Sequence, residues 1–299
     1  MERALGQSLK AILKKIWSKC IRIRRSLEFE MRNRLSSSSI LDSNGPVLSM
    51  TTHGYRFTRA YLAIESIAAG RLKPSRCILW ISEKECSQQL PQPLQRLVSR
   101  GLEIRLSEDL GPHTKYYPYI AEESAFQGPL VTADDDKIYP KDWLEKLVAA
   151  YDAEPNVIHC YRAHRMQLLG RRLAPYREWR PCFDRAPSHL NFVTGAAGAI
   201  YPPKFLQALK SRGLAFLKCC PQSDDIWLTA NSLREGIKVA QVDSRYRRSA
   251  FSTVPGSQKE SLYHSNVTGG GNDVQLLHTL TDEDLQSLIR LEGIEQSIS

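Results

Sequence analysis

Hydrophobic and polar residues alternate in blocks along residues 46–153. Short apolar runs predict strands in "VLSMT", "RCILWIS", "LEIRLSE" and "PLVTA". Between them, apolar residues at three- and four-residue spacing predict helices, such as "RFTRAYLAIESIAAG" with Gly70 as its stop. Strands that alternate with crossover helices form a parallel sheet. The pattern therefore predicts an α/β fold with a mainly parallel sheet flanked by helices.

The pattern is less regular beyond residue 155. "NVIHCYRAHRM" predicts a strand, and "NFVTGAAGAIYPPKFLQALKSRG" predicts a Gly-rich loop, a strand and a helix. "SDDIWLTANSLREG" predicts a helix that ends at Gly236, with Ser223 or Asp224 as its N-cap. Neither a GxGxxG nor a GxxxxGK[ST] motif follows the first strand, which disfavours a dinucleotide-binding or P-loop protein.

The first 35 residues form a separate basic segment. "LKAILKKIWSKCIRIRRSLEF" places Trp17 and other apolar residues at helical spacing, with lysines and arginines mainly on the other side. This pattern predicts a basic amphipathic helix over 1–35 that lies on anionic lipid, followed by a linker over 36–45. A helix that docks its apolar stripe on the body of the protein is one alternative, and a transit peptide is another.

The charge is concentrated in that segment. Residues 1–35 hold ten Lys/Arg and three Glu, so they carry +7 of the net charge of +9. The rest of the chain is nearly balanced, which disfavours a nucleic-acid binder. No apolar run approaches the roughly 18 residues of a membrane span, and no secretory signal is present. Seven cysteines without a CxxC pair indicate neither a disulfide framework nor a zinc site, so we expect a cytoplasmic protein.

Three adjacent carboxylates carry the first chemical signal. In "GPLVTADDDKIYP", Asp134, Asp135 and Asp136 directly follow a buried strand and precede a predicted crossover helix. They are thus expected at the carboxyl edge of the sheet, where ligands bind in open α/β folds. Their mutual repulsion is tolerable if a divalent cation neutralises them, because hard cations prefer carboxylate oxygens. A solvated acidic turn, or helix capping, is the alternative.

Three motifs together resemble a bacterial branch of the family 2 glycosyltransferases. They are "VTADDDKIYPKDWLEKL", "GAAGAIYPP" and "SDDIWLTANSLREGI", and the resemblance covers roughly residues 46–250. It implies a GT-A fold, a nucleotide-sugar donor, a divalent cation (Mn²⁺ or Mg²⁺) and inversion at the anomeric carbon. It assigns 46–255 to the glycosyltransferase domain and leaves 256–299 as a C-terminal tail expected to pack near the active site. The QxxRW motif of polymer-forming members is absent, which disfavours processive synthesis.

The resemblance also implies roles for the acidic residues. Asp136 is the expected metal ligand, and Asp134 and Asp135 are expected at the donor, with Asp134 on the ribose or a metal-bound water. Asp225 matches the catalytic base, with Asp224 beside it as the second candidate or as a helix cap. Adjacent carboxylates tend to raise one pKa, which suits a base.

The remaining candidates come from position and residue type, and each has a structural alternative. At the carboxyl edge, Thr51, Thr52 and His53 would face the nucleotide, and Lys115 would reach the diphosphate; an ordinary loop and solvated surface are the alternatives. Gly195 permits close approach of an acceptor. The other acceptor and metal candidates are Trp179 and Trp227 as sugar-stacking rings, with the core as the alternative for Trp227, and His264 as a late metal ligand.

The predicted function is transfer of a sugar from a nucleotide donor to a cell-surface glycan or its lipid-linked precursor, without nucleic-acid binding. We expect the protein to work on the inner membrane face as a peripheral protein. Two rival hypotheses are a glycoside hydrolase that uses two carboxylates and a non-catalytic, cation-dependent carbohydrate-binding or scaffold protein. Asp-rich clusters favour a metal over the apolar pocket that an acid catalyst needs.

Overall fold

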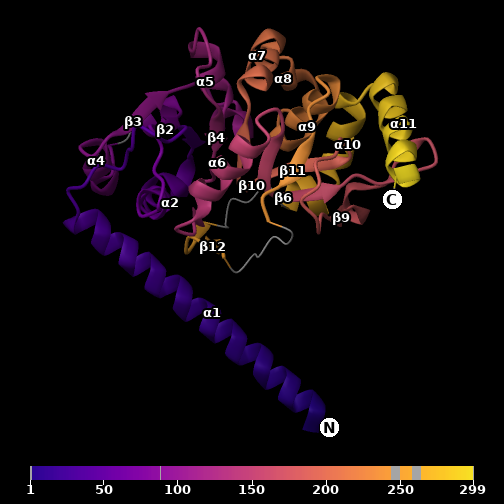
Figure 1. Cartoon of the computed structure of the whole chain (residues 1–299). Helices are drawn as coiled ribbons and strands as arrows, with labels where there is room; N and C mark the ends of the chain where they lie inside the picture. The colour runs from indigo at the N-terminus through magenta and orange to yellow at the C-terminus, as the bar shows by residue number, and fades with distance from the viewer. Residues whose placement is uncertain (1, 88, 244–249, 258–263, 299) are drawn as a thin grey trace.

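A central mixed sheet organises the molecule. The computed structural model describes residues 2–87, 89–243, 250–257 and 264–298, and Figure 1 shows helices packed around this sheet with one long helix projecting from the body. The sheet has eight strands in the order β11-β6-β10-β4-β1-β2-β3, with β9 paired to β6. The strand bounds are β1 Val47–Thr51, β2 Arg76–Ile81, β3 Leu102–Leu106, β4 Leu130–Thr132, β6 Ile158–Arg165, β9 Arg180–Pro181, β10 Asn191–Tyr201 and β11 Val239–Gln241.

Most neighbouring strands run parallel. β1 pairs in parallel with both β2 and β4, β2 with β3, and β6 with β11. β10 lies antiparallel between β4 and β6, so β4 and β6 point in the same direction. Their carboxyl ends therefore meet at one edge of the sheet. The predicted α/β class, with a mainly parallel sheet flanked by helices and an N-terminal helix, is confirmed.

Helices cover both faces of the sheet. Successive residues of β2 belong to two different hydrophobic clusters, because side chains alternate along a strand. One cluster gathers apolar residues of α7, α8 and α9, and the other gathers those of α2, α4 and α6. The helix bounds are α2 Tyr61–Ala68, α3 Glu83–Cys86, α4 Gln92–Val98, α5 Tyr117–Glu122, α6 Trp143–Ala153, α7 Pro203–Arg212, α8 Phe216–Cys219, α9 Asp224–Arg234, α10 Gly271–Thr279 and α11 Asp282–Ile298.

The N-terminal helix α1 (Glu2–Leu35) docks only by its last turns. Phe29 and Asn33 are buried, and Asn33 Nδ2 donates a 3.0 Å hydrogen bond to Oε1 of the fully buried Glu65. Glu65 also pairs with Arg100 and with Arg32 of α1, at 3.2 Å and 3.3 Å. A buried carboxylate with two cations and an amide is fully compensated, so this contact fixes the helix to the body.

Apart from Phe29, the apolar residues of α1 whose side chains the structure describes are exposed. Trp17 is 70% exposed and Met31 60%, and Leu27 and Leu35 are also exposed. Figure 1 shows the rest of α1 running away from the body. The helix therefore docks through Phe29 and Asn33 rather than through the stripe that the sequence predicts for lipid contact. Within the described residues, no helix combines the length and hydropathy of a membrane span.

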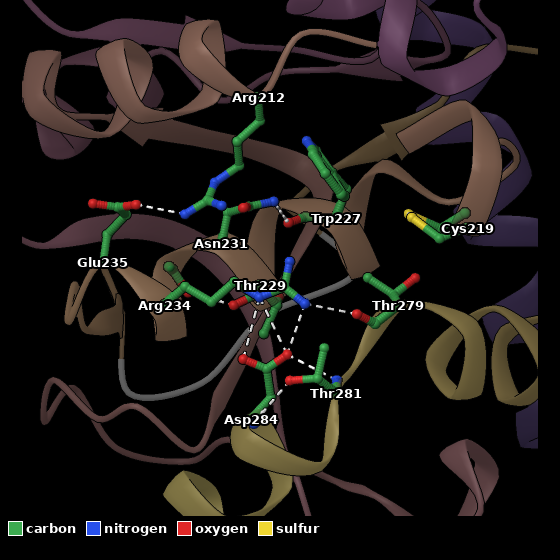
Figure 2. A network of polar contacts seen from close by, with 12 residues as sticks. Arg212, Cys219, Trp227, Thr229, Asn231, Arg234, Glu235, Thr279, Thr281 and Asp284 are labelled. Carbon is green, nitrogen blue, oxygen red and sulfur yellow. Dashed lines mark hydrogen bonds and ion pairs between the residues drawn. The ribbon is translucent and has the colours of Figure 1, made fainter. Parts of the chain in front are cut away.

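Polar contacts attach the C-terminal helix α11 to α9. Arg234 donates to Asp284 Oδ2 at 2.7 Å and to the carbonyl of Thr279 at 2.7 Å (Figure 2). Asp284 and Thr281 form a reciprocal cap: Thr281 N donates to Asp284 Oδ2 at 2.9 Å, and Asp284 N donates to Thr281 Oγ1 at 3.2 Å. Burial raises the pKa of Asp284, but the bonds from Arg234 and Thr281 and the charge of Arg234 together lower it by more, so the net shift is downward. The cap and the ion pair hold α11 against the outer side of α9.

Candidate active site

The three aspartates lie where the connectivity of the sheet reverses. β1 has β2 on one side and β4 on the other, and the triplet directly follows β4. Thr52, at the end of β1, donates a 2.6 Å hydrogen bond from Oγ1 to Asp135 Oδ2. The two strand ends are thus in direct contact, at the kind of position where open α/β sheets bind ligands.

The backbone of the triplet is held from two directions. Asp134 N donates to the hydroxyl of the buried Tyr139 at 2.7 Å. The carbonyl of Asp136 accepts from Val254 N at 2.8 Å, where β12 (Ser252–Thr253) pairs with β5 (Lys137–Ile138). The carboxylates therefore project from a fixed loop rather than from a mobile acidic turn.

Arg56 is the residue at this edge that the sequence did not identify. It lies in the short helix η1 (Gly54–Thr58), and its NH1 and NH2 are 3.2 Å from Asp135 Oδ1 and 3.8 Å from Asp136 Oδ2. Lys137 Nζ is 3.1 Å from Asp136 Oδ1. For Arg56, the signal available in the sequence was its place in the polar loop directly after the first strand. These cations offset the mutual repulsion of the adjacent aspartates.

Lys115 joins the triplet to the second acidic motif. It ends the short helix η2 (Gly111–Lys115), and its Nζ is 3.4 Å from Asp134 Oδ1 and 3.0 Å from Asp224 Oδ2. The latter oxygen has this ion pair but no well-directed hydrogen bond. Burial lowers the pKa of Lys115, but the charges of Asp224, Asp134 and Asp225 together raise it by more, so the net shift is well upward. The lysine stays charged between the two motifs.

Gly195 completes the site from β10. The pairing of β10 with β6 breaks between Thr194 and Ala199, and within this irregular stretch Gly195 N donates a 2.7 Å hydrogen bond to Asp225 Oδ1. A Cβ atom at position 195 would lie 3.2 Å from both Asp225 Oδ1 and Lys115 Nζ. The glycine therefore leaves open the space between the lysine and Asp225.

Two carboxyl groups of the site have raised pKa values. Burial and the neighbouring Asp224 raise the pKa of Asp225 to about 7, against the opposing effects of Lys115 and the Gly195 N–H. Burial raises the pKa of Asp135 to about 6, although Arg56 and Thr52 favour its charged form. Strongly shifted carboxyl groups in one cluster are typical of catalytic sites. Asp225 can exchange a proton near neutral pH.

The other candidates predicted from the sequence lie at varying distances from this cluster. Thr51 Oγ1 donates to the carbonyl of Trp80 at 3.2 Å, which makes it part of the strand end, and His53 is an exposed residue directly before η1. His264 begins a short helical turn, but its side chain lies outside the described residues.

The two tryptophans are core residues. Trp179 is buried against Tyr176 and Phe192, and its Nε1 donates to the carbonyl of Ala174 at 2.8 Å. Trp227 is buried against Phe216. A ring enclosed by other aromatic side chains has no free face for a sugar, so their predicted stacking role does not fit these positions.

The site suits a divalent cation only with help from a ligand. Among the described residues, no group of three or more His, Cys, Asp or Glu side chains gathers to hold a metal by itself. Five carboxylates nevertheless share this edge with three cations, Arg56, Lys115 and Lys137. Asp134 has a 21% exposed side chain. This donor set fits Mg²⁺ or Mn²⁺ bound by one or two carboxylates, with phosphate oxygens and water as the other ligands.

Comparisons with known proteins give only distant structural similarity. No protein-family model matches the chain, and no curated protein matches it. Among solved structures, the inositol-1-phosphate CTP transferase from T. maritima is similar at 12% identity and a TM-score of 0.43, over 67% of this chain and 86% of that one. S. aureus TarS 1-349 has 12% identity and a TM-score of 0.44, over 67% of this chain and 58% of that one.

A third similar structure is CMP:2-keto-3-deoxy-manno-octonic acid synthetase complexed with CTP. It has 11% identity and a TM-score of 0.38, over 66% of this chain and 89% of that one. Similarities at this level assign no activity to the present chain. Its function must be argued from its own site.

Proposed function

We propose that this protein is a metal-dependent, inverting glycosyltransferase with a GT-A fold. It transfers a sugar from a nucleotide-sugar donor to a cell-surface glycan or a lipid-linked acceptor. The observation that carries this proposal is the meeting of the triplet with Asp225 around Lys115 and Gly195 at one edge of the sheet. Groups that can hold a diphosphate and a group that can accept a proton thus face one open space.

The donor is bound at the ends of β1 and β4. Arg56 and Lys115 are the cations that face the diphosphate. Each is ion-paired with a carboxylate in this structure, Arg56 with Asp135 and Lys115 with Asp224. Asp134 and Asp136 would hold the cation, which when bound neutralises the charge that develops on the departing nucleoside diphosphate. Lys115, buried and permanently charged, adds to that neutralisation without the need to move far.

The acceptor hydroxyl is activated at the start of α9. Asp225 accepts its proton, since a carboxylate with a pKa of about 7 is matched to work at neutral pH. The Gly195 N–H fixes one oxygen of Asp225, which leaves the other oxygen for the acceptor. Asp224 raises the pKa of Asp225 and anchors Lys115, so it acts as a positioning residue.

Purified protein with Mn²⁺ and a panel of nucleotide sugars tests the proposal. We expect release of nucleoside diphosphate from one donor and loss of that release on addition of EDTA. Absence of release from every donor, with or without acceptor glycans, would contradict it. Activity that survives EDTA would favour a hydrolase, and a protein that binds nucleotide but never turns it over would favour a scaffold.

We further propose that α1 holds the protein on the inner membrane face. The exposed Trp17, Leu27 and Met31 lie away from the docked Phe29, so they can contact a flat surface without obstruction by the body. The net charge of +7 on residues 1–35 attracts anionic lipid, at about 1 kcal/mol for each basic residue near the surface.

Vesicle sedimentation tests this membrane contact. We expect the full chain to bind phosphatidylglycerol vesicles at low salt and to leave them at high salt, because exposed charges are screened beyond ~10 Å at 0.1 M. Deletion of residues 1–20 removes Trp17 and five of the ten basic residues, so it should weaken binding strongly and spare the contacts of Phe29 and Asn33. Full-length protein that ignores anionic vesicles at low salt would contradict the proposal.

A further inference from the structure

A second basic segment, separate from α1, lies beside the candidate active site. Residues 161–190 contain seven arginines, no lysine and two carboxylates, Glu178 and Asp184. Since residues 1–35 carry +7 and this segment +5 of a total of +9, the remainder of the chain is net acidic. The positive charge outside residues 1–35 is therefore concentrated in this segment.

The fold places this segment at the same edge as the triplet. β6 points in the same direction as β4, so its last residues reach the edge where Asp134 lies. Arg162 is paired with Thr194, which directly precedes Gly195 of the site. From there the chain continues through the hairpin of β7 (Leu168–Leu169) and β8 (Arg172–Leu173), and through η3 (Tyr176–Glu178), to β9. Figure 1 shows β9 lying next to β6.

Five of the seven arginines form no ion pair with a carboxylate of the described residues. In the register of β6 and β9, Arg165 lies directly opposite Arg180, an arrangement of like charges that destabilises a sheet. Arg165 also donates to Ser188 Oγ at 2.7 Å and to Asn191 Oδ1 at 3.3 Å, which ties β6 to the start of β10 and the segment before it. Five further arginines are exposed, and within the described part of the chain no ion pair joins any of them to a carboxylate: Arg171, Arg172, Arg177, Arg180 and Arg185.

We propose that this arginine surface binds repeated phosphate groups of the acceptor. The inference rests on the proposed function, since it names the class of acceptor for that site. Arginine presents a planar fork that matches phosphate with paired hydrogen bonds, which lysine does not. The five exposed charges are spread over β8, η3, β9 and the adjoining loops, so they fit a chain of anions better than a single one. Phe183, 64% exposed and between Arg180 and Arg185 in sequence, offers an apolar face to the units that join the phosphates.

Binding of sodium polyphosphate to the full chain tests the proposal without any turnover. The test variant is Arg177→Glu with Arg180→Glu, and the matched control is Lys204→Glu with Lys218→Glu, two exposed lysines on α7 and α8. Both pairs change the net charge equally and leave α1 intact. We expect the arginine variant to bind at least about tenfold more weakly, because charged hydrogen bonds contribute ~1.5–3 kcal/mol each, and the control to change less than about threefold.

Hydrogen exchange then locates the contact. Polyphosphate should protect residues 162–185, and polygalacturonate, which offers carboxylates in place of phosphates, should protect them less. Equal losses in the two variants, or protection confined to residues 1–35, would overturn the proposal. The proposal would also be overturned if a single-stranded DNA oligonucleotide bound this segment more tightly than polyphosphate does. The same holds if the arginine variant no longer bound phosphatidylglycerol vesicles but still bound polyphosphate. Release of nucleoside diphosphate by the wild-type protein without acceptor tests the proposed function separately.

Discussion

The two halves of the sheet meet the site in different ways. In the parallel half, β3, β2, β1 and β4 run in unbroken register, and the carboxylates that follow β4 are held by side-chain cations. In the antiparallel half, β10 breaks its register with β6, and the break supplies a backbone N–H to Asp225. In the parallel half, a bound anion can therefore replace the carboxylates as the partner of the cations. The antiparallel half instead holds one carboxylate, Asp225, in position to accept a proton.

Lys115 is the contact between these halves. It reaches Asp134 on one side and Asp224 on the other. A diphosphate that attracts Lys115 would weaken its pairing with Asp224, and the charge beside Asp225 would change as a result. The comparison therefore predicts that mutations in the two halves have separable effects on binding and on chemistry.

The largest difference between the effect on sugar transfer and the effect on nucleotide binding is expected from Asp225→Asn. The amide cannot accept the proton of the acceptor, so sugar transfer should fall by roughly 10²–10⁴ while nucleotide binding is retained. Steady-state kinetics and calorimetry measure the two quantities. Asp243→Asn is the matched control and should change neither; this half-exposed aspartate lies 3.8 Å from Lys146. Unchanged turnover in the Asp225 variant would remove the antiparallel half from the chemistry.

The reverse effect is expected from Asp136→Ala. Loss of this carboxylate should weaken Mn²⁺-dependent nucleotide binding by about tenfold to a hundredfold, in line with the loss of a charged contact. The fold should persist, because the hydrogen bond from Val254 uses the backbone carbonyl of residue 136. Titration calorimetry with and without Mn²⁺ measures this, with Asp142→Ala at an exposed ion pair as control. Unchanged affinity in Mn²⁺ would contradict the assignment.

A pair of glycine variants distinguishes the open space of the site from the core beside it. Gly195→Ala brings a Cβ to 3.2 Å from Asp225 Oδ1 and should slow transfer about tenfold by misplacing that group. Gly198→Ala brings a Cβ to 2.5 Å from the Trp143 ring at a φ of +97°, so it should mainly lower the melting temperature. If both variants affect only stability, Gly195 has no special role at the site.

The last effect, which is small within one pH unit of the pKa, is a pH dependence assigned to Asp225. Transfer should rise about tenfold per pH unit below the pKa of about 7 and level off above it, since the base must lose its proton. The folded pKa lies above the ordinary value of 3.8, so this group favours folding most at low pH. That contribution is lost as pH rises toward 7. Urea denaturation between pH 5 and 8 should show a smaller loss in Asp225→Asn than in the wild type, and Asp135, whose pKa is raised to about 6, contributes to the loss that remains.

The parallel half could be predicted in detail because its signals are local. Each strand is one apolar run, each helix has a regular spacing, and the triplet directly follows its strand. The contact of Thr52 with Asp135 then follows from parallel neighbours that end at one edge. Arg56 was missed because its partner lies 79 residues further along the chain, and no local pattern shows which loop residue turns inward.

The antiparallel half was harder to predict because its residues depend on tertiary packing. "NFVTGAAGAIY" predicts a glycine-rich loop and a short strand, yet it is one long irregular strand, since its neighbours β4 and β6 supply the pairing on both sides. Trp179 resembles an exposed sugar platform in sequence, but Tyr176 and Phe192 enclose it. Residue type alone cannot show whether an aromatic ring lies in the core or at a site.

The buried contact of α1 with Glu65 determines what kind of attachment the helix provides. Residues 2–24 extend beyond the last docked turns, a rigid arm of roughly 35 Å at 1.5 Å per residue. A flexible tether would only raise the local concentration of the enzyme near a surface. A rigid arm also restricts the rotation of the protein body relative to the surface. Because Arg25 of α1 contacts Ala250 and Ser252, beside the strand pair that follows the triplet, surface-bound copies would share one tilt and present the same edge of the sheet.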